Sequence, residues 1–131
     1  MTTELAAPSA LPVVVVGAGP IGLAAAANLV SRGTHAVVLE AGAHAGAAIS
    51  DWGHVSLFSP WQYDIDPVAR ELLEGTGWVS PDAESIPTGT DLVRDYLQPL
   101  AATAELAPLI RYNSRVIGMS RQGIDSTKTM G

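Results

Sequence analysis

The stretch Val13-Val-Val-Val-Gly-Ala-Gly-Pro-Ile-Gly22 decides the fold of this 131-residue chain. Its four consecutive valines predict a buried strand, because a continuous β-branched run is typical of a strand covered on both faces. The glycines after it predict a tight turn, and a helix is expected from Pro20 to about Arg32, ending at Gly33. Pro20 suits the first helical position, where the missing N–H of proline costs no hydrogen bond.

A second apolar run, Ala36–Leu39, predicts another strand buried on both faces, with Glu40 at its carboxyl end. Strand, helix and strand then form a βαβ unit with parallel strands and a right-handed crossover. The sequence therefore indicates an α/β fold with a Rossmann-like domain.

The spacing GxGxxG between a strand and a helix predicts a binding site for the pyrophosphate of a dinucleotide. We expect Gly17 to allow the tight turn, Gly19 to let the phosphates approach the backbone, and Gly22 to let the helix pack closely. The helix N-terminus offers free N–H groups and a partial positive charge. Glu40 is expected to accept hydrogen bonds from both hydroxyls of a ribose and to repel a 2′-phosphate. The alternative is a glycine-rich turn that binds nothing.

The chain then makes a long helical excursion before any further strand. A glycine- and alanine-rich loop with one helical turn at most is expected over residues 41–53. Asp66 predicts the cap of a helix that runs to about Glu74, and Thr90 the cap of a longer helix that runs to about Glu105. Pro99 is expected to kink the longer helix. Such an excursion favours FAD over NAD, because a simple NAD-binding half reaches its third strand after one helix.

A late pair of strands is expected at Leu109–Tyr112 and Val116–Ser120, followed by a polar tail from Asp125. The sequence shows no evident third parallel strand beside the first. We therefore expect an incomplete Rossmann-like domain over residues 13–131, preceded by a disordered leader over residues 1–12. An open sheet edge would favour association of the chain into homo-oligomers.

Composition narrows the classes of function. The chain has no cysteine, which excludes disulfides and thiolate metal sites, and a net charge of −6, which argues against nucleic acid or an anionic membrane as the main partner. The uncharged run Leu11–Ser31 is long enough for a membrane span, but its glycines and the lack of a basic leader argue against one. A cytoplasmic protein is expected. His35, His44 and His54 share no ligand spacing, so no metal site is expected.

The residues Gly17-Ala18-Gly19-Pro20-Ile21-Gly22, together with Glu40, resemble the FAD fingerprint of flavoproteins with two dinucleotide-binding domains. Two later stretches, Trp52–Trp61 and Pro87–Val93, resemble bacterial flavin-containing monooxygenase-like oxidoreductases. The resemblance covers nearly all of residues 11–125. It implies that the chain is the N-terminal FAD-binding segment of an FAD-dependent oxidoreductase.

The resemblance also implies how the adenosine half of the cofactor is held. The glycine turn, including Pro20 and Ile21, would hold the FAD pyrophosphate, and Glu40 the adenosine ribose. Ala41, which follows Glu40, is implied to lie beside the same ribose. Such proteins often have a basic residue at this position. The backbone of Val116 would face the adenine.

Toward the flavin, the resemblance implies roles for Gly46 and Trp52. Gly46-Ala47 stands where such flavoproteins often carry two glycines, and Trp52 would line the flavin end, with a plain core or lid position as the alternative. His54 is expected to be a surface or packing residue rather than a flavin neighbour. No catalytic nucleophile, triad or general acid is evident.

In the whole protein, NAD(P)H would reduce FAD, and the reduced flavin would act on a small substrate or on O₂. This chain has a single glycine motif, so NAD(P)H is expected to bind only through residues beyond it. The isolated chain is expected to be inactive and to bind FAD weakly or not at all. Two alternatives stay open: a segment of an NAD-binding dehydrogenase or reductase, and a non-catalytic nucleotide-binding module.

Overall fold

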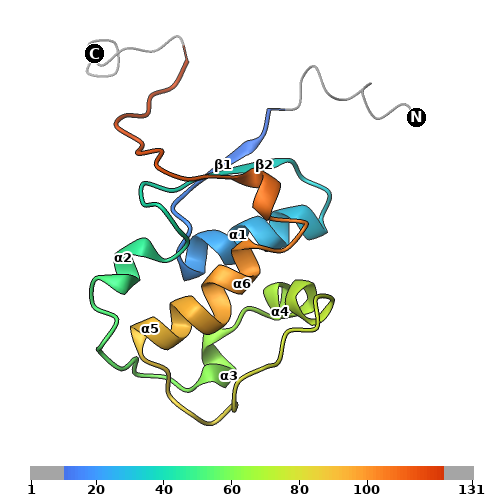
Figure 1. The fold of residues 1–131 in the computed structure, drawn as a ribbon. Coiled ribbons are helices and arrows are strands. Elements are labelled where there is room, and N and C mark those ends of the chain that lie inside the picture. The colour runs from blue at the N-terminus through green and yellow to red at the C-terminus, as the bar shows by residue number, and fades with distance from the viewer. Residues whose placement is uncertain (1–10, 123–131) are drawn as a thin grey trace.

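A computed structural model describes residues 11–122 and confirms a Rossmann-like α/β fold (Figure 1). Strand β1 (Val13–Val16), helix α1 (Pro20–Ser31) and strand β2 (Ala36–Leu39) form the expected βαβ unit. The two strands pair in parallel along their whole length. Residues 1–10 of the expected leader and the tail from Asp125 lie outside the described residues.

Helix α1 begins and ends as its sequence predicts. Gly19 is the N-cap, Pro20 is the first helical residue, and Gly33 has a φ of 74°, a left-handed conformation that favours glycine. Ala26 and Ala27 are fully buried, so the helix approaches the sheet closely. The uncharged run from Leu11 is thus divided between β1, the glycine turn and α1. No helix within residues 11–122 is both long and apolar enough to cross a bilayer.

The third strand, β3 (Ile110–Arg111), pairs in parallel with β2, which gives the strand order β1-β2-β3. The strand expected at Leu109–Tyr112 is therefore present but only two residues long. The strand expected at Val116–Ser120 is wrong, and with it the strand position of Val116. Ile117 and Met119 in this segment are exposed, and no neighbouring strand satisfies the backbone N–H and C=O groups there.

The excursion between β2 and β3 consists of short helical elements. They are α2 (Ala47–Ser50), α3 (Trp61–Asp64), α4 (Pro67–Glu74), α5 (Gly89–Leu92), the π-helical turn η3 (Val93–Leu97), α6 (Gln98–Ala101) and the 3₁₀ turn η4 (Ala107–Leu109). Helix α2 is the single turn expected in the glycine–alanine loop. Helix α4 has the expected bounds, because the Asp66 carboxylate accepts the N–H groups of Val68 and Ala69 at 3.0 Å.

The longer helix differs from its prediction at both ends. Its cap is Thr88 and not Thr90, because the Thr88 hydroxyl accepts the Asp91 N–H at 3.1 Å while the Asp91 carboxylate accepts the Thr88 N–H at 3.0 Å. This capping box satisfies two backbone N–H groups at once. The helix ends at Ala101 rather than near Glu105.

The π-helical turn η3 lies directly before the proline of α6. Proline lacks an N–H, and its ring crowds the carbonyl four residues earlier, which for Pro99 is the carbonyl of Asp95 within η3. A wider turn is one way in which a helix accommodates such crowding. The apolar side chains that recur at helical spacing along this helix are all buried, namely Leu92, Val93, Tyr96, Leu97 and Leu100.

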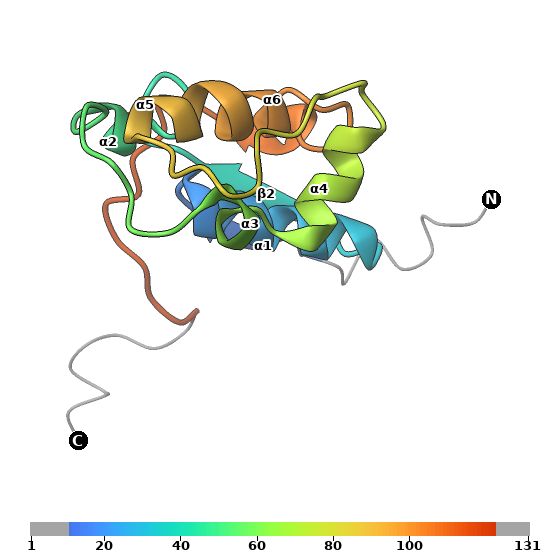
Figure 2. The same ribbon diagram turned by 90° about the horizontal axis from the view of Figure 1, so that it is seen from below.

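The described helices cover one face of the sheet. In Figure 1 they lie on one side of β1 and β2, and Figure 2, seen from that side, shows α4 beside both α1 and α6. Val15 and Val38 point to this side and pack in the core, whereas Val14 and Val16 are 54% and 58% exposed. The expectation that β1 is buried on both faces is therefore wrong. No described helix covers its second face, and the irregular segment 116–120, which lines a cavity with Val14 and Val16, leaves both valines exposed.

Candidate dinucleotide-binding site

The glycine turn between β1 and α1 has the geometry that its spacing predicts. Gly17 has a φ of 99°, and its N–H donates to the carbonyl of Leu39 at 2.8 Å, which ties the turn to the end of β2. A Cβ atom at Gly22 would overlap the carbonyl oxygen of Gly17, so close packing of α1 requires glycine there. A Cβ at Gly19 would meet nothing within 4 Å, so this backbone is open to an approaching group.

Glu40 is buried at the end of β2, and its carboxylate joins two loops. Oε1 accepts the N–H of Ala18 in the glycine turn at 2.7 Å, and Oε2 accepts the N–H of Gly42 at 2.6 Å. These bonds to a charged acceptor hold both loops in place. Each carboxylate oxygen has two lone pairs, so Glu40 still has acceptor capacity for a ligand. Sequence reasoning missed this clamping role.

A second contact fixes the glycine turn from the side of α2. The carbonyl of Ala18 accepts the N–H of Gly46 at 2.9 Å. Gly46 has a φ of 73°, and a Cβ there would lie 2.8 Å from a methyl group of Val93. A glycine is therefore required at Gly46 by both its backbone conformation and the close approach of η3.

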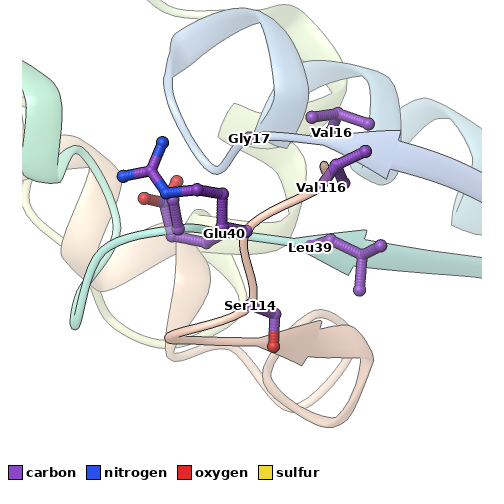
Figure 3. A pocket seen from close by; sticks show the side chains of 8 residues that line it. Val16, Gly17, Leu39, Glu40, Ser114 and Val116 are labelled. Atoms are coloured by element: carbon purple, nitrogen blue, oxygen red, sulfur yellow. The ribbon is translucent and has the colours of Figure 1, made fainter. Parts of the chain in front are cut away.

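The segment after β3 lies against the end of β2. The N–H of Ser114 donates to the carbonyl of Glu40 at 2.8 Å, and the N–H of Asn113 donates to the carbonyl of Gly42 at 2.9 Å. These backbone bonds bring Val116 beside Glu40 although Val116 is not in a strand (Figure 3).

The same segment places Tyr112 near Glu40. Burial raises the pKa of the Tyr112 hydroxyl, and the negative charge of Glu40 raises this pKa further.

Two cavities flank the carboxylate of Glu40. The first has a volume of about 240 Å³ (Figure 3), and its lining residues are Val16, Gly17, Leu39, Glu40, Ala41, Ser114, Arg115 and Val116. The second has a volume of about 350 Å³, and its lining residues are Glu40, Ala41, Gly42, Ala47, Ala48, Asp51 and Arg115. Glu40, Ala41 and Arg115 line both.

The structure brings together Gly17, Glu40, Ala41 and Val116 around the first cavity. Arg115 was missed as a site residue, although it directly precedes Val116. Its place beside Glu40 follows from the pairing of Ile110 and Arg111 with the end of β2 and from the backbone bond of Ser114 to Glu40. A two-residue strand is too short to be recognised in the sequence.

The remaining predicted site residues do not line these two cavities. Pro20 and Ile21 form the first turn of α1, where the Ile21 side chain is exposed. Trp52 lies apart, 40% exposed, with its ring against Gly89, where a Cβ atom would be 3.0 Å from two ring carbons. Between residues 11 and 122, no three His, Asp or Glu side chains cluster as metal ligands would.

Comparisons with known proteins support the fold that holds this site. Residues 15–70 match the family model of the NAD(P)-binding Rossmann-like domain. Two crystal structures of OTEMO in complex with FAD and NADP are similar, form 4 with a TM-score of 0.58 and form 1 with 0.59. Both are 24% identical in sequence over 82% of this chain, which spans 20% of the form 4 chain and 19% of the form 1 chain. A further OTEMO structure, the FAD-bound form 2, has a TM-score of 0.58.

These matches confirm the Rossmann fold and the expected likeness to a larger flavoprotein. This chain thus spans about a fifth of the OTEMO chain. A comparison with curated proteins found no match.

Proposed function

We propose that this chain is the FAD-binding portion of a flavin-dependent oxidoreductase that is NAD(P)H-using and monooxygenase-like. The observation that carries the proposal is the Glu40 carboxylate bound to the N–H of Ala18, which joins the acidic ribose acceptor to the glycine turn. The likeness to OTEMO, a protein crystallised with FAD and NADP, supports the choice of FAD. The substrate and NAD(P)H sites would then belong to further parts of a longer protein.

The residues present fit the adenosine diphosphate half of the cofactor. The free N–H groups at the start of α1, including those of Ile21 and Gly22, would hold the pyrophosphate beside the open backbone of Gly19. Glu40 would accept the ribose hydroxyls with its remaining lone pairs, and the backbone of Val116 would face the adenine. Bound FAD would supply redox chemistry by taking up and passing on electrons.

Toward the flavin, the proposal assigns a supporting role to Gly46 and a lining role to Trp52. Gly46 holds the glycine turn through Ala18, and Trp52 follows the next helical turn, α2. No described cavity at Glu40 includes Trp52, so its lining role depends on the extent of the flavin beyond these cavities. Residues 13–131 would form a partial cytoplasmic domain that is inactive by itself.

A second candidate is a segment of an NAD-binding dehydrogenase or reductase. The family model matched by residues 15–70 is described as NAD(P)-binding, which favours this candidate. The helical excursion from α2 to η4 favours FAD, because a simple NAD-binding half has one helix between its second and third strands.

The test is a comparison of ligands on the purified 131-residue protein. FAD, NAD⁺ and FMN are titrated separately, with tryptophan fluorescence and equilibrium dialysis as readouts. We expect FAD to bind more tightly than NAD⁺, and FMN, which lacks the adenosine half, not to bind detectably. Tighter binding of NAD⁺ than of FAD would favour the dehydrogenase, and binding of FMN as tight as that of FAD would contradict a site for the adenosine half.

A further inference from the structure

The two cavities beside Glu40 contain one positively charged side chain. Ala41, which lines both, has no charge, and the acids Glu40 and Asp51 make the lining negative. Arg115 also lines both cavities and is the sole basic residue in either lining. Residue 41 thus carries no positive charge, whereas Arg115, which is distant in sequence, places a positive charge beside the same two cavities.

The backbone holds Arg115 in this position. The preceding residue, Ser114, donates its N–H to the carbonyl of Glu40 at 2.8 Å, and Asn113 donates to the carbonyl of Gly42 at 2.9 Å. Among residues 11–122 the ion pairs within 4.0 Å are those of Arg94 with Asp91 and Asp95. The guanidinium of Arg115 therefore has no described carboxylate partner that would neutralise it.

We propose that Arg115 supplies the positive charge that binds the phosphates of the adenosine diphosphate half of the dinucleotide, in place of a basic residue after Glu40. The inference rests on the proposed function and deepens it. Phosphates entering beside Glu40 and Asp51 meet two negative charges, and the α1 N-terminus offsets only about half a charge. A guanidinium adds a full charge and N–H groups that suit phosphate oxygens.

The test measures binding of ADP and of adenosine to the 131-residue protein by NMR chemical-shift titration. Three variants are compared with the unchanged protein: Arg115→Gln removes the charge, Arg115→Lys keeps it, and Arg111→Gln removes a charge from β3 outside both cavities. We expect Arg115→Gln to weaken ADP binding about tenfold, the lower end of the scale of one charged hydrogen bond, and adenosine binding less than about twofold. Arg115→Lys and Arg111→Gln should stay within about threefold for ADP.

The other possible results of these titrations contradict either the role of Arg115 or the proposed function. ADP affinity of Arg115→Gln within about twofold of the unchanged protein overturns the role of Arg115 and leaves the proposed function intact. An equal loss for ADP and adenosine overturns the charge role, because the side chain would then act on the adenosine itself. An unchanged protein that binds FMN as tightly as FAD overturns the proposed function. Thermal melting of each variant checks that it is folded.

Discussion

The two sides of strand β1 differ although both consist of valine. Val15 points to the helices and packs in the core, while Val14 and Val16 point to the side that no described helix covers and stay exposed beside the segment 116–120. Identical side chains in one four-residue strand thus have opposite environments, set by which neighbours the fold provides. The glycine turn repeats this contrast, since Gly22 is closed in by backbone and Gly19 is open.

The sharpest test of this contrast is a truncation on each side. Leu23 of α1 is fully buried, so Leu23→Ala should lower the free energy of unfolding by about 2–5 kcal/mol. Val16→Ala, on the open side, should change it by less than about 0.5 kcal/mol. Urea unfolding followed by circular dichroism measures both. Equal losses would mean that the open side is covered in solution.

The glycine turn offers the second test. Gly22→Ala should lower the free energy of unfolding by about 1–3 kcal/mol, because the new methyl group overlaps the carbonyl of Gly17. Gly19→Ala, in open space, should cost less than about 1 kcal/mol.

The larger Gly19→Val change should weaken dinucleotide binding more than about twofold, which corresponds to about 0.4 kcal/mol. A branched side chain would occupy the space through which the pyrophosphate approaches the backbone. Calorimetric titration of FAD measures the change. Unchanged affinity would remove Gly19 from the site.

Glu40 has a structural role, because it binds two loops, and it also lines both cavities. Glu40→Ala leaves the N–H groups of Ala18 and Gly42 without their acceptor and should lower the free energy of unfolding by about 1–3 kcal/mol. Ligand binding should weaken by a similar free energy. Glu40→Gln, which keeps one acceptor oxygen, should lose less stability than Glu40→Ala in the same urea titration. If both variants match the unchanged protein, the clamp contributes nothing.

The smallest effect on stability and a distinct effect on assembly are expected at the free edge of β1. Val14→Lys should change the free energy of unfolding by less than about 0.5 kcal/mol. It should also reduce self-association, because lysine on an edge strand opposes pairing with another chain. Gel filtration with light scattering compares the unchanged protein, Val14→Lys and the control Val55→Lys, which is exposed away from the sheet. An unchanged protein that is already a monomer would contradict the expected association.

The elements defined by local signals could be predicted from the sequence. The valine run with its glycine turn, and the Asp66-Pro67 cap of α4, carry their information in adjacent residues, and the structure confirms them. The cap of α5 is Thr88 rather than the expected Thr90, because Asp91 follows Thr88 by three residues and completes a capping box, whereas Val93 stands at that distance from Thr90. The strand at 116–120 failed because a strand depends on its neighbours as well as on its own residues.

In the candidate site, too, the features set by adjacent residues could be predicted and those set by distant segments could not. The spacing of Gly17, Gly19 and Gly22 predicted the shape of the turn, because each reason for glycine there is local. The double bond of Glu40 to two backbone N–H groups and the approach of Arg115 depend on segments far apart in sequence. Neither residue has a sequence neighbour that indicates those contacts.

Ala18 has a small, fully buried side chain and a backbone that three segments share. Its N–H is bound by Glu40 and its carbonyl by Gly46, so both of its hydrogen-bonding groups are already used within the chain. The turn therefore has little conformational freedom left to lose when a ligand arrives, and the entropic cost of ordering it is paid during folding. Ligand capture at this turn should then proceed by simple encounter with a ready-made surface, with no slow rearrangement preceding it.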